Sequence, residues 1–201
     1  MSACSSLALS YDIEENREKA EVYYTKACNG EYMRACFNLG LMHDIKDANA
    51  SMIEKRHSYY NRACDNGFMR ACTTLGIIYS NGRGVKKDPK KGLDYYNKAC
   101  HSGDADGCFY SGVIYEVGYL IAQDKQKAKT LYTKACDGNN MNACSNLGLL
   151  YMYGGAIKQD MHKAKTLFSK SCEGNYARGC FNLATLYEKG LVTKQNKHIA
   201  Q

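Results

Sequence analysis

Ten of the eleven cysteines in this 201-residue chain follow a strict spacing. They form five pairs with members eight residues apart, and each pair lies 36 residues after the one before. The pairs are Cys28 and Cys36, Cys64 and Cys72, Cys100 and Cys108, Cys136 and Cys144, and Cys172 and Cys180. Paired cysteines can form disulfides, bind zinc or carry out thiol redox chemistry.

Zinc binding and redox catalysis both fit this pattern poorly. Two cysteines per repeat cannot complete a four-coordinate zinc site, and no histidine position recurs through the repeats to supply further ligands, since only His162 and His198 are 36 residues apart. Redox catalysis usually employs C-x-x-C, which is absent. We therefore predict five structural disulfides, with no metal site and no cofactor. Such heavy use of disulfides is typical of an oxidising compartment, periplasmic or extracellular.

A disulfide between these positions requires the chain to reverse. Eight residues of one helix would separate the cysteines by about 12 Å, whereas a disulfide tolerates Cα separations up to about 7 Å. A glycine that can end a helix in the left-handed conformation follows the first cysteine at the second or third position in every repeat. These glycines are Gly30, Gly67, Gly103, Gly138 and Gly174. Each disulfide is thus expected to join the end of one helix to the start of the next.

The segments around the cysteines carry helical patterns. In Ala71-Cys72-x-x-Leu75-Gly76-x-x-Tyr79, the apolar residues recur at helical spacing. Asn16, Asp88, Asp124 and Asp160 stand in register as N-caps of the alternate helices. A 36-residue period of this kind is typical of a solenoid, so we predict an all-α array of antiparallel helix pairs.

We interpret residues 1–201 as a single solenoid array. A half repeat occupies 1–28, full repeats occupy about 29–64, 65–100, 101–136 and 137–172, and an incomplete repeat occupies 173–201.

Two departures from the repeat carry information. Cys4 matches the second cysteine of a pair whose partner would precede Met1, so we expect a free thiol at Cys4. We interpret the chain as a fragment or as having a misplaced start. In the irregular segment 41–57, Arg56 replaces a small residue and is expected to open the local packing. We attribute that irregularity to drift rather than to a specialised surface.

The recurring pattern Lys-Ala-x-x-x-Tyr-x-Lys-Ala-Cys, followed by Ala-Cys-x-x-Leu-Gly-x-x-Tyr, resembles the Sel1-like repeat, a relative of the tetratricopeptide repeat. With its paired cysteines the chain is similar to the helicobacter cysteine-rich (Hcp) family over about residues 3 to 192. The resemblance implies a right-handed α/α superhelix, secretion, and protein or peptide binding. Some members of that family are described as penicillin-binding proteins or weak β-lactamases.

Binding residues are expected on the first helix of each pair, which lines the concave face in such arrays. The side opposite the apolar stripe falls two residues before and two residues after each second cysteine. Unlike the core positions, these sites differ in charge between repeats, and their Arg and Asn side chains suit carboxylates and peptide groups. The candidates are Arg34, Asn38, Arg70, Thr74, Asp106, Tyr110, Asn142, Asn146, Arg178 and Asn182. Alternatively, they are ordinary solvated helix positions.

The leading hypothesis is a secreted or periplasmic scaffold that binds a protein or peptide on its concave face. No signal peptide is visible, and no apolar run is long enough to span a membrane. The net charge of +7 is interleaved along the chain, so no nucleic-acid partner is expected. The S-x-x-K, S-D-N and K-T-G motifs of serine β-lactamases are absent, and no catalytic residue is assigned.

Two alternatives to the scaffold hypothesis stay open. One is a penicillin-binding protein with slow β-lactamase (hydrolase) activity, whose ligand would be a β-lactam or peptidoglycan fragment, and the other is a cytosolic adaptor with reduced cysteines.

Overall fold

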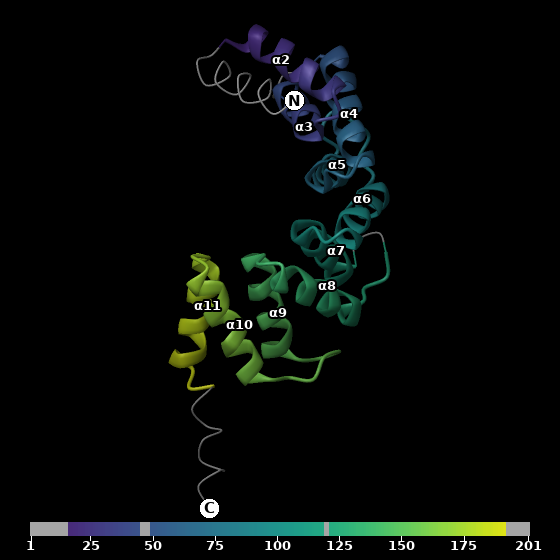
Figure 1. The fold of residues 1–201 in the computed structure, drawn as a ribbon. Coiled ribbons are helices and arrows are strands. Elements are labelled where there is room, and N and C mark those ends of the chain that lie inside the picture. The colour runs from purple at the N-terminus through teal and green to yellow at the C-terminus, as the bar shows by residue number, and fades with distance from the viewer. Residues whose placement is uncertain (1–15, 45–48, 119–120, 192–201) are drawn as a thin grey trace, which may run out of the picture. The chain divides into compact units, whose positions relative to one another are not determined.

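The computed structural model describes residues 16–44, 49–118 and 121–191. All the regular elements within these ranges are α-helices (Figure 1). They are α2 (Arg17–Asn29), α3 (Met33–Met42), α4 (Ala50–Asp65), α5 (Met69–Asn81), α6 (Pro89–His101), α7 (Ala105–Val117), α8 (Lys125–Asp137), α9 (Met141–Tyr153), α10 (Met161–Glu173) and α11 (Ala177–Glu188). We call α3, α5, α7, α9 and α11 the first helices, and α2, α4, α6, α8 and α10 the second helices.

The helices group into two compact units, residues 1–99 and 100–201, and the boundary falls near the end of α6. The core of the first unit is formed by buried Tyr24, Leu39, Tyr60, Leu75 and Ile78 among others. The second unit has its own cores, one around Tyr132 and Leu147 and another around Phe168 and Leu186. Organisation as a single array therefore remains a prediction.

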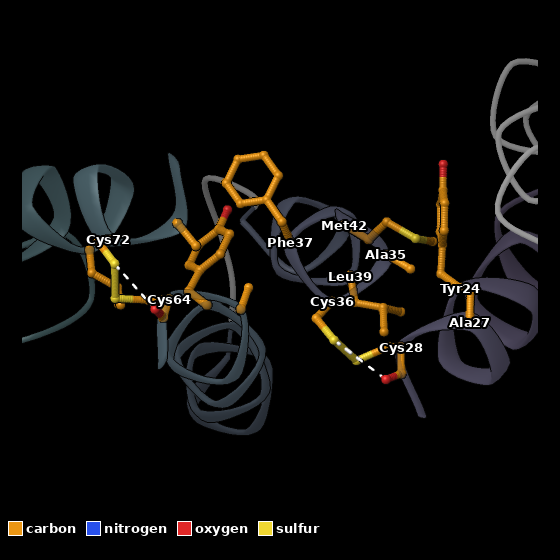
Figure 2. Packing of buried hydrophobic residues seen from close by; sticks show 14 of the residues in the cluster. Tyr24, Ala27, Cys28, Ala35, Cys36, Phe37, Leu39, Met42, Cys64 and Cys72 are labelled. Atoms are coloured by element: carbon orange, nitrogen blue, oxygen red, sulfur yellow. Dashed lines mark hydrogen bonds between the residues drawn. A yellow bond between two sulfur atoms is a disulfide. The ribbon is translucent and has the colours of Figure 1, made fainter. Parts of the chain in front are cut away.

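Five disulfides join each second helix to the first helix that follows, in the pairing expected from the cysteine spacing. Their Cα–Cα distances lie between 4.4 Å and 4.8 Å, within the range that a disulfide requires. Figure 2 shows Cys28–Cys36 and Cys64–Cys72 buried among apolar side chains. The dashed contact from Cys36 Sγ to the Cys28 carbonyl oxygen, 3.8 Å long, is no hydrogen bond, because a disulfide sulfur carries no proton.

The turn between the bridged helices differs in one respect from the sequence prediction. The residue with positive φ is always the third after the first cysteine, as in Glu31, Gly67, Gly103, Asn139 and Asn175. The expectation that Gly30, Gly138 and Gly174 take the left-handed conformation is therefore wrong, since their φ values are −81°, −77° and −76°. Gly138 instead allows Ala105 of α7 to pack closely against its backbone, because a Cβ at residue 138 would lie only 2.8 Å from the Cβ of Ala105.

Basic side chains connect neighbouring second helices. The series Lys26, Arg62, Lys98, Lys134 and Lys170 precedes each first cysteine by two residues. Arg62 Nη1 donates to Asn29 Oδ1 over 3.1 Å, and Lys170 Nζ donates to the Cys136 carbonyl oxygen over 2.8 Å. The positive charge also complements the negative C-terminal end of the dipole of the previous second helix, which carries the acceptor. For Arg62, Lys98 and Lys170 the repeated charge is thus explained by contacts within the protein.

N-caps begin most second helices at the predicted residues. The side chains of Asp88, Asp124 and Asp160 each accept a hydrogen bond from the backbone N–H three residues later. Asn16 precedes α2 but makes no side-chain cap bond. In the irregular repeat, Asn49 supplies the cap by accepting from the Met52 backbone N–H over 2.9 Å, so α4 begins three residues earlier than the period predicts.

A glycine in each of four first helices receives an aromatic ring from the next second helix. Gly40 faces Tyr60, Gly76 faces Tyr96, Gly112 faces Tyr132 and Gly148 faces Phe168. A Cβ at any of these glycines would overlap the ring, and all four rings are buried. The glycines therefore lower helix propensity in exchange for close packing of a ring against the helix backbone.

We expect Gly76→Ala to destabilise the protein although alanine is the better helix former. The added methyl group overlaps Tyr96, and overpacking of this kind outweighs the helix-propensity gain, for a net loss of about 2 kcal/mol. Urea unfolding measures the difference. Adding Tyr96→Leu should recover part of the loss because it makes room, whereas strictly additive effects would contradict the proposed contact.

Arg56 does not open the packing of the irregular repeat, so that expectation is wrong. Its side chain is buried, and its Nη1 atom lies 2.8 Å from Asp44 Oδ1. Its Nη2 atom donates to the Arg83 carbonyl oxygen over 2.6 Å. Arg83 Nη2 in turn lies 2.8 Å from Asp44 Oδ1. The buried charge is accommodated because the Asp44 carboxylate neutralises the Arg56 guanidinium, while Arg83, which contacts the same carboxylate oxygen, is exposed to solvent.

Candidate binding face on the first helices

The residues two positions before each second cysteine lie in the first turn of the first helices. Arg34, Arg70, Asp106 and Arg178 are exposed, and Asn142 is half-buried. The adjacent alanine or glycine and the cysteine beyond it point into the core, since the helix turns about 100° per residue. These five side chains therefore lie on the outer side of their helices, and they differ in charge from repeat to repeat.

The residues two positions after each second cysteine are less accessible. Asn38, Thr74, Tyr110 and Asn146 are half-buried, and Asn182 is buried with 9% of its surface exposed. Asn182 Nδ2 donates to Ser145 Oγ over 3.0 Å, so this amide is engaged within the protein. The Thr74 hydroxyl donates to the Arg70 carbonyl oxygen one turn back in its own helix.

In the first unit, the candidate face is basic and has an aromatic floor. The Arg70 guanidinium carbon lies 5.6 Å from the centre of the Phe37 ring, a cation–π distance. Phe37 in turn packs against Phe68 and Tyr60, with ring centres 5.2 Å and 5.5 Å away. A largely buried aromatic cluster thus supports the Arg70 side chain, while the side chain itself stays exposed.

In the second unit, the face carries a hydrogen-bonded network that sequence reasoning did not identify. Tyr132 OH donates to Glu116 Oε2 over 2.7 Å, and Asn146 Nδ2 donates to the same hydroxyl oxygen over 3.3 Å. Burial, followed by the bond to Glu116, raises the pKa of Tyr132, so the phenol stays protonated. Asn140 Nδ2 donates to Asp106 Oδ1 over 2.7 Å, which orients that carboxylate.

One sequence signal pointed to Glu116. It stands eight residues after Cys108, and four of the five repeats carry a polar residue at the equivalent position: Asp44, Ser80, Glu116 and Glu188, with Met152 in the fifth. Asp44, as described above, pairs with Arg56 and Arg83. At Asp44 and Glu116 this position therefore holds a carboxylate that bonds a side chain of the following second helix, but the apolar pattern around it in the sequence hides the signal.

Two histidines lie within the irregular segment 41–57. His43 Nε2 is 3.3 Å from Glu21 Oε1, and its ring stacks on Tyr59. His57 Nδ1 lies 2.7 Å from the Ile53 carbonyl oxygen. Burial lowers the pKa of both imidazoles, which disfavours their charged forms near neutral pH. Among the residues that the structure describes, no three metal-ligating side chains come together.

Two further sequence predictions concern the chain ends and the membrane. Cys4, the predicted free thiol, lies outside the described residues. Among the helices that the structure describes, none is both long enough and apolar enough to cross a bilayer.

These features define a disulfide-bridged α/α repeat scaffold. The model of the Sel1 repeat family matches residues 3–32, 70–104, 105–140, 142–176 and 177–201, and the chain belongs to this family. The unmatched stretch between the first two ranges contains the irregular repeat with Arg56. Sel1 repeats typically mediate protein–protein interaction.

Solved structures of other Sel1-type proteins resemble this chain. A Sel1 repeat protein from Oxalobacter formigenes is 24% identical with a TM-score of 0.82, covering 94% of this chain and 79% of its own. The Helicobacter pylori cysteine rich protein B is 34% identical with a TM-score of 0.53, covering 65% of this chain and 93% of its own. The antigen c5321 of uropathogenic Escherichia coli is 24% identical with a TM-score of 0.64, covering 94% of this chain and 49% of its own. A comparison with curated proteins finds no match. The α/α solenoid fold predicted from the sequence is thus confirmed.

Proposed function

We propose that this protein is a secreted or periplasmic scaffold that binds protein or peptide segments along its first helices. The observation that carries the proposal is the contrast between two sets of positions on these helices. The cysteine, leucine and glycine sites keep their residue types almost throughout and pack the core, whereas the exposed sites around Arg34, Arg70, Asp106 and Arg178 change in charge. A face that varies on a constant framework suits recognition of a particular partner.

The first unit offers the most specific chemistry for such a partner. Arg34 and Arg70 present two exposed guanidinium groups, and the half-buried Asn38 and Thr74 lie on the same helices. Guanidinium groups bind carboxylates through paired hydrogen bonds, and Asn offers both donors and acceptors to a peptide backbone. We therefore expect the preferred ligand of this unit to be an acidic peptide segment.

A peptide selection tests the assignment of the face. Peptides selected from a random displayed library on the oxidised protein would be labelled, and their affinities measured by fluorescence polarisation. The double variant Arg34→Ala and Arg70→Ala should weaken binding about tenfold or more, since a hydrogen bond to a charged group contributes about 1.5–3 kcal/mol.

The matched control removes the same charge from the second helices. Arg17→Ala with Lys55→Ala also deletes two exposed basic side chains, one on α2 and one on α4. It should change affinity by about twofold or less, because only long-range attraction is lost. Equal losses in both double variants would show that the peptide senses net charge rather than this face.

The compartment and the alternatives are tested separately. The disulfides in the structure support an oxidising environment. Mass spectrometry of alkylated, unreduced protein from its native source should find five bridges, whereas eleven free thiols would support the reduced adaptor. A nitrocefin assay tests the β-lactamase alternative, and turnover that survives repeated purification would overturn the scaffold-only assignment.

A further inference from the structure

One asparagine of this sequence stands two residues before a hydroxyl side chain. Asn49, Ala50 and Ser51 form Asn-x-Ser, whereas none of the other asparagines is followed at that distance by serine or threonine. Asn-x-Ser/Thr, with any residue except proline in the middle, is the acceptor sequence for N-linked glycosylation. Because so short a match arises readily by chance, the environment of Asn49 decides whether it can serve as an acceptor.

All three residues of this acceptor sequence are exposed at the start of α4. Asn49 precedes the helix with extended backbone angles, φ −72° and ψ 169°, and Ala50 and Ser51 lie in the first turn. Asn49 is tied to the helix by hydrogen bonds from the backbone N–H groups of Met52 and Ile53. Fraying of this turn removes no side chain from the core, and the first N–H groups of a helix have no partner within it. The acceptor sequence can therefore enter the site of an enzyme at small cost.

The side-chain amide of Asn49 offers different atoms for capping and for modification. Its Oδ1 atom accepts the capping hydrogen bond from the Met52 backbone N–H over 2.9 Å. Glycan transfer uses the amide nitrogen, Nδ2, and leaves Oδ1 in place as an acceptor. A glycan on Asn49 is therefore compatible with the folded helix. The cap alone does not require an amide, because aspartate caps α8 and α10.

Asn140 shows an unsuitable asparagine at the same place relative to a helix. It is also an N-cap, with Oδ1 accepting from the Ala143 backbone N–H, but only 8% of its surface is exposed. Its Nδ2 atom donates to Asp106 Oδ1 over 2.7 Å, and the carbonyl oxygen of the next residue, Met141, accepts from the Ser171 hydroxyl. Asn140 is thus held by the atom that a glycan would need, whereas Asn49 is not.

We propose that Asn49 is an N-glycosylation site, modified by an oligosaccharyltransferase that uses a polyprenyl-pyrophosphate-linked oligosaccharide. In the transfer, Asn49 Nδ2 attacks the anomeric carbon of the first sugar and loses one proton to the transferase. The new N–C bond replaces the C–O bond to pyrophosphate, and the polyprenyl pyrophosphate leaves. The inference rests on the proposed export, because such glycans belong to surface loops of secreted proteins. The glycan would lie in the irregular segment 41–57, which the model of the Sel1 repeat leaves unmatched.

Transfer to the purified full chain tests the site independently of export. The oxidised protein is incubated with a single-subunit oligosaccharyltransferase that requires only Asn-x-Ser/Thr and with its lipid-linked donor, and the intact mass is measured. We expect a single glycan per chain, placed on Asn49 by peptide mapping. Asn49→Asp should keep the cap and the fold but lose the glycan. Ser51→Ala should lose the glycan too, whereas Ser51→Thr should retain it.

Asn142→Ser supplies the matched control, because it gives Asn140 the same acceptor sequence at the same place relative to a helix. It is combined with Asn49→Asp so that only Asn140 can be modified. The folded variant should take up at least about tenfold less glycan than the unaltered chain, since Asn140 is buried and its Nδ2 atom is engaged. A synthetic peptide of residues 137–143 with the same Asn142→Ser change should accept the glycan, which would show that the sequence itself is competent.

Two results with purified protein would overturn the inference: no transfer to the unaltered chain, or equal transfer to Asn49 and to Asn140 in the folded proteins. Protein from the native source should carry the glycan on Asn49, detected by peptide mapping before and after enzymatic release. Five bridges together with an unmodified Asn49 would overturn the inference and leave the proposed export standing. Eleven free thiols would overturn both.

Discussion

Complete reduction of the five disulfides should unfold the protein at room temperature. Each bridge closes a short loop and contributes about 2.5 kcal/mol by restricting the unfolded chain. Together the five bridges contribute about as much as the whole net stability of a typical domain, 5–15 kcal/mol. Far-UV circular dichroism in a phosphine reductant should therefore show loss of helix, with alkylation and mass spectrometry confirming eleven free thiols, the ten from the bridges and Cys4.

The order of reduction should follow the burial of the sulfurs. Cys172 and Cys180 are half-buried, whereas Cys64 and Cys72 have no exposed surface. Because exchange requires a reductant to reach a sulfur atom, Cys172–Cys180 should open first under native conditions.

Two results would contradict this account of the disulfides. A helical spectrum that persists with all eleven cysteines alkylated would show that packing alone holds the fold. Simultaneous opening of all five bridges would show that reduction follows global unfolding rather than local access. As a control, Cys172→Ala with Cys180→Ala should lose only about 2.5 kcal/mol and remain folded.

Asp44→Asn should be among the most destabilising single substitutions in the first unit. Arg56 is buried, and Asp44 is the carboxylate that pairs with it. Removing the negative charge leaves a buried guanidinium uncompensated, which costs about 3–5 kcal/mol. Denaturant unfolding measures the loss.

Asp65→Asn provides the matched control. It removes the same charge from an exposed pair with Lys98 and should cost less than about 1 kcal/mol. Combining Asp44→Asn with Arg56→Ala should restore much of the stability, because the buried charge is gone and alanine stands at the equivalent site in α2, α8 and α10. Equal effects of Asp44→Asn and Asp65→Asn would contradict the role assigned to the buried pair.

The sequence alone determined the repeat, the disulfide pairing and most helix starts. Helical geometry leaves one solution for cysteines eight residues apart, because only a chain reversal brings them within bridging distance. N-caps such as Asp124 are equally local, since the carboxylate bonds a backbone N–H three residues away. These features depend on neighbours in the chain, so a single sequence is sufficient to predict them.

The tertiary structure decided which polar and apolar positions are available to a partner. Arg56 is buried because Asp44 and the Arg83 carbonyl, 12 and 27 residues away, meet it in space. Asn182 and Asn38 occupy the same repeat position, yet only Asn182 is buried. Phe181 is exposed although Phe37 at the equivalent position is buried, because burial depends on the helix that packs alongside. Periodicity cannot predict such differences, since it assigns equivalent positions the same environment while the contacts around them differ.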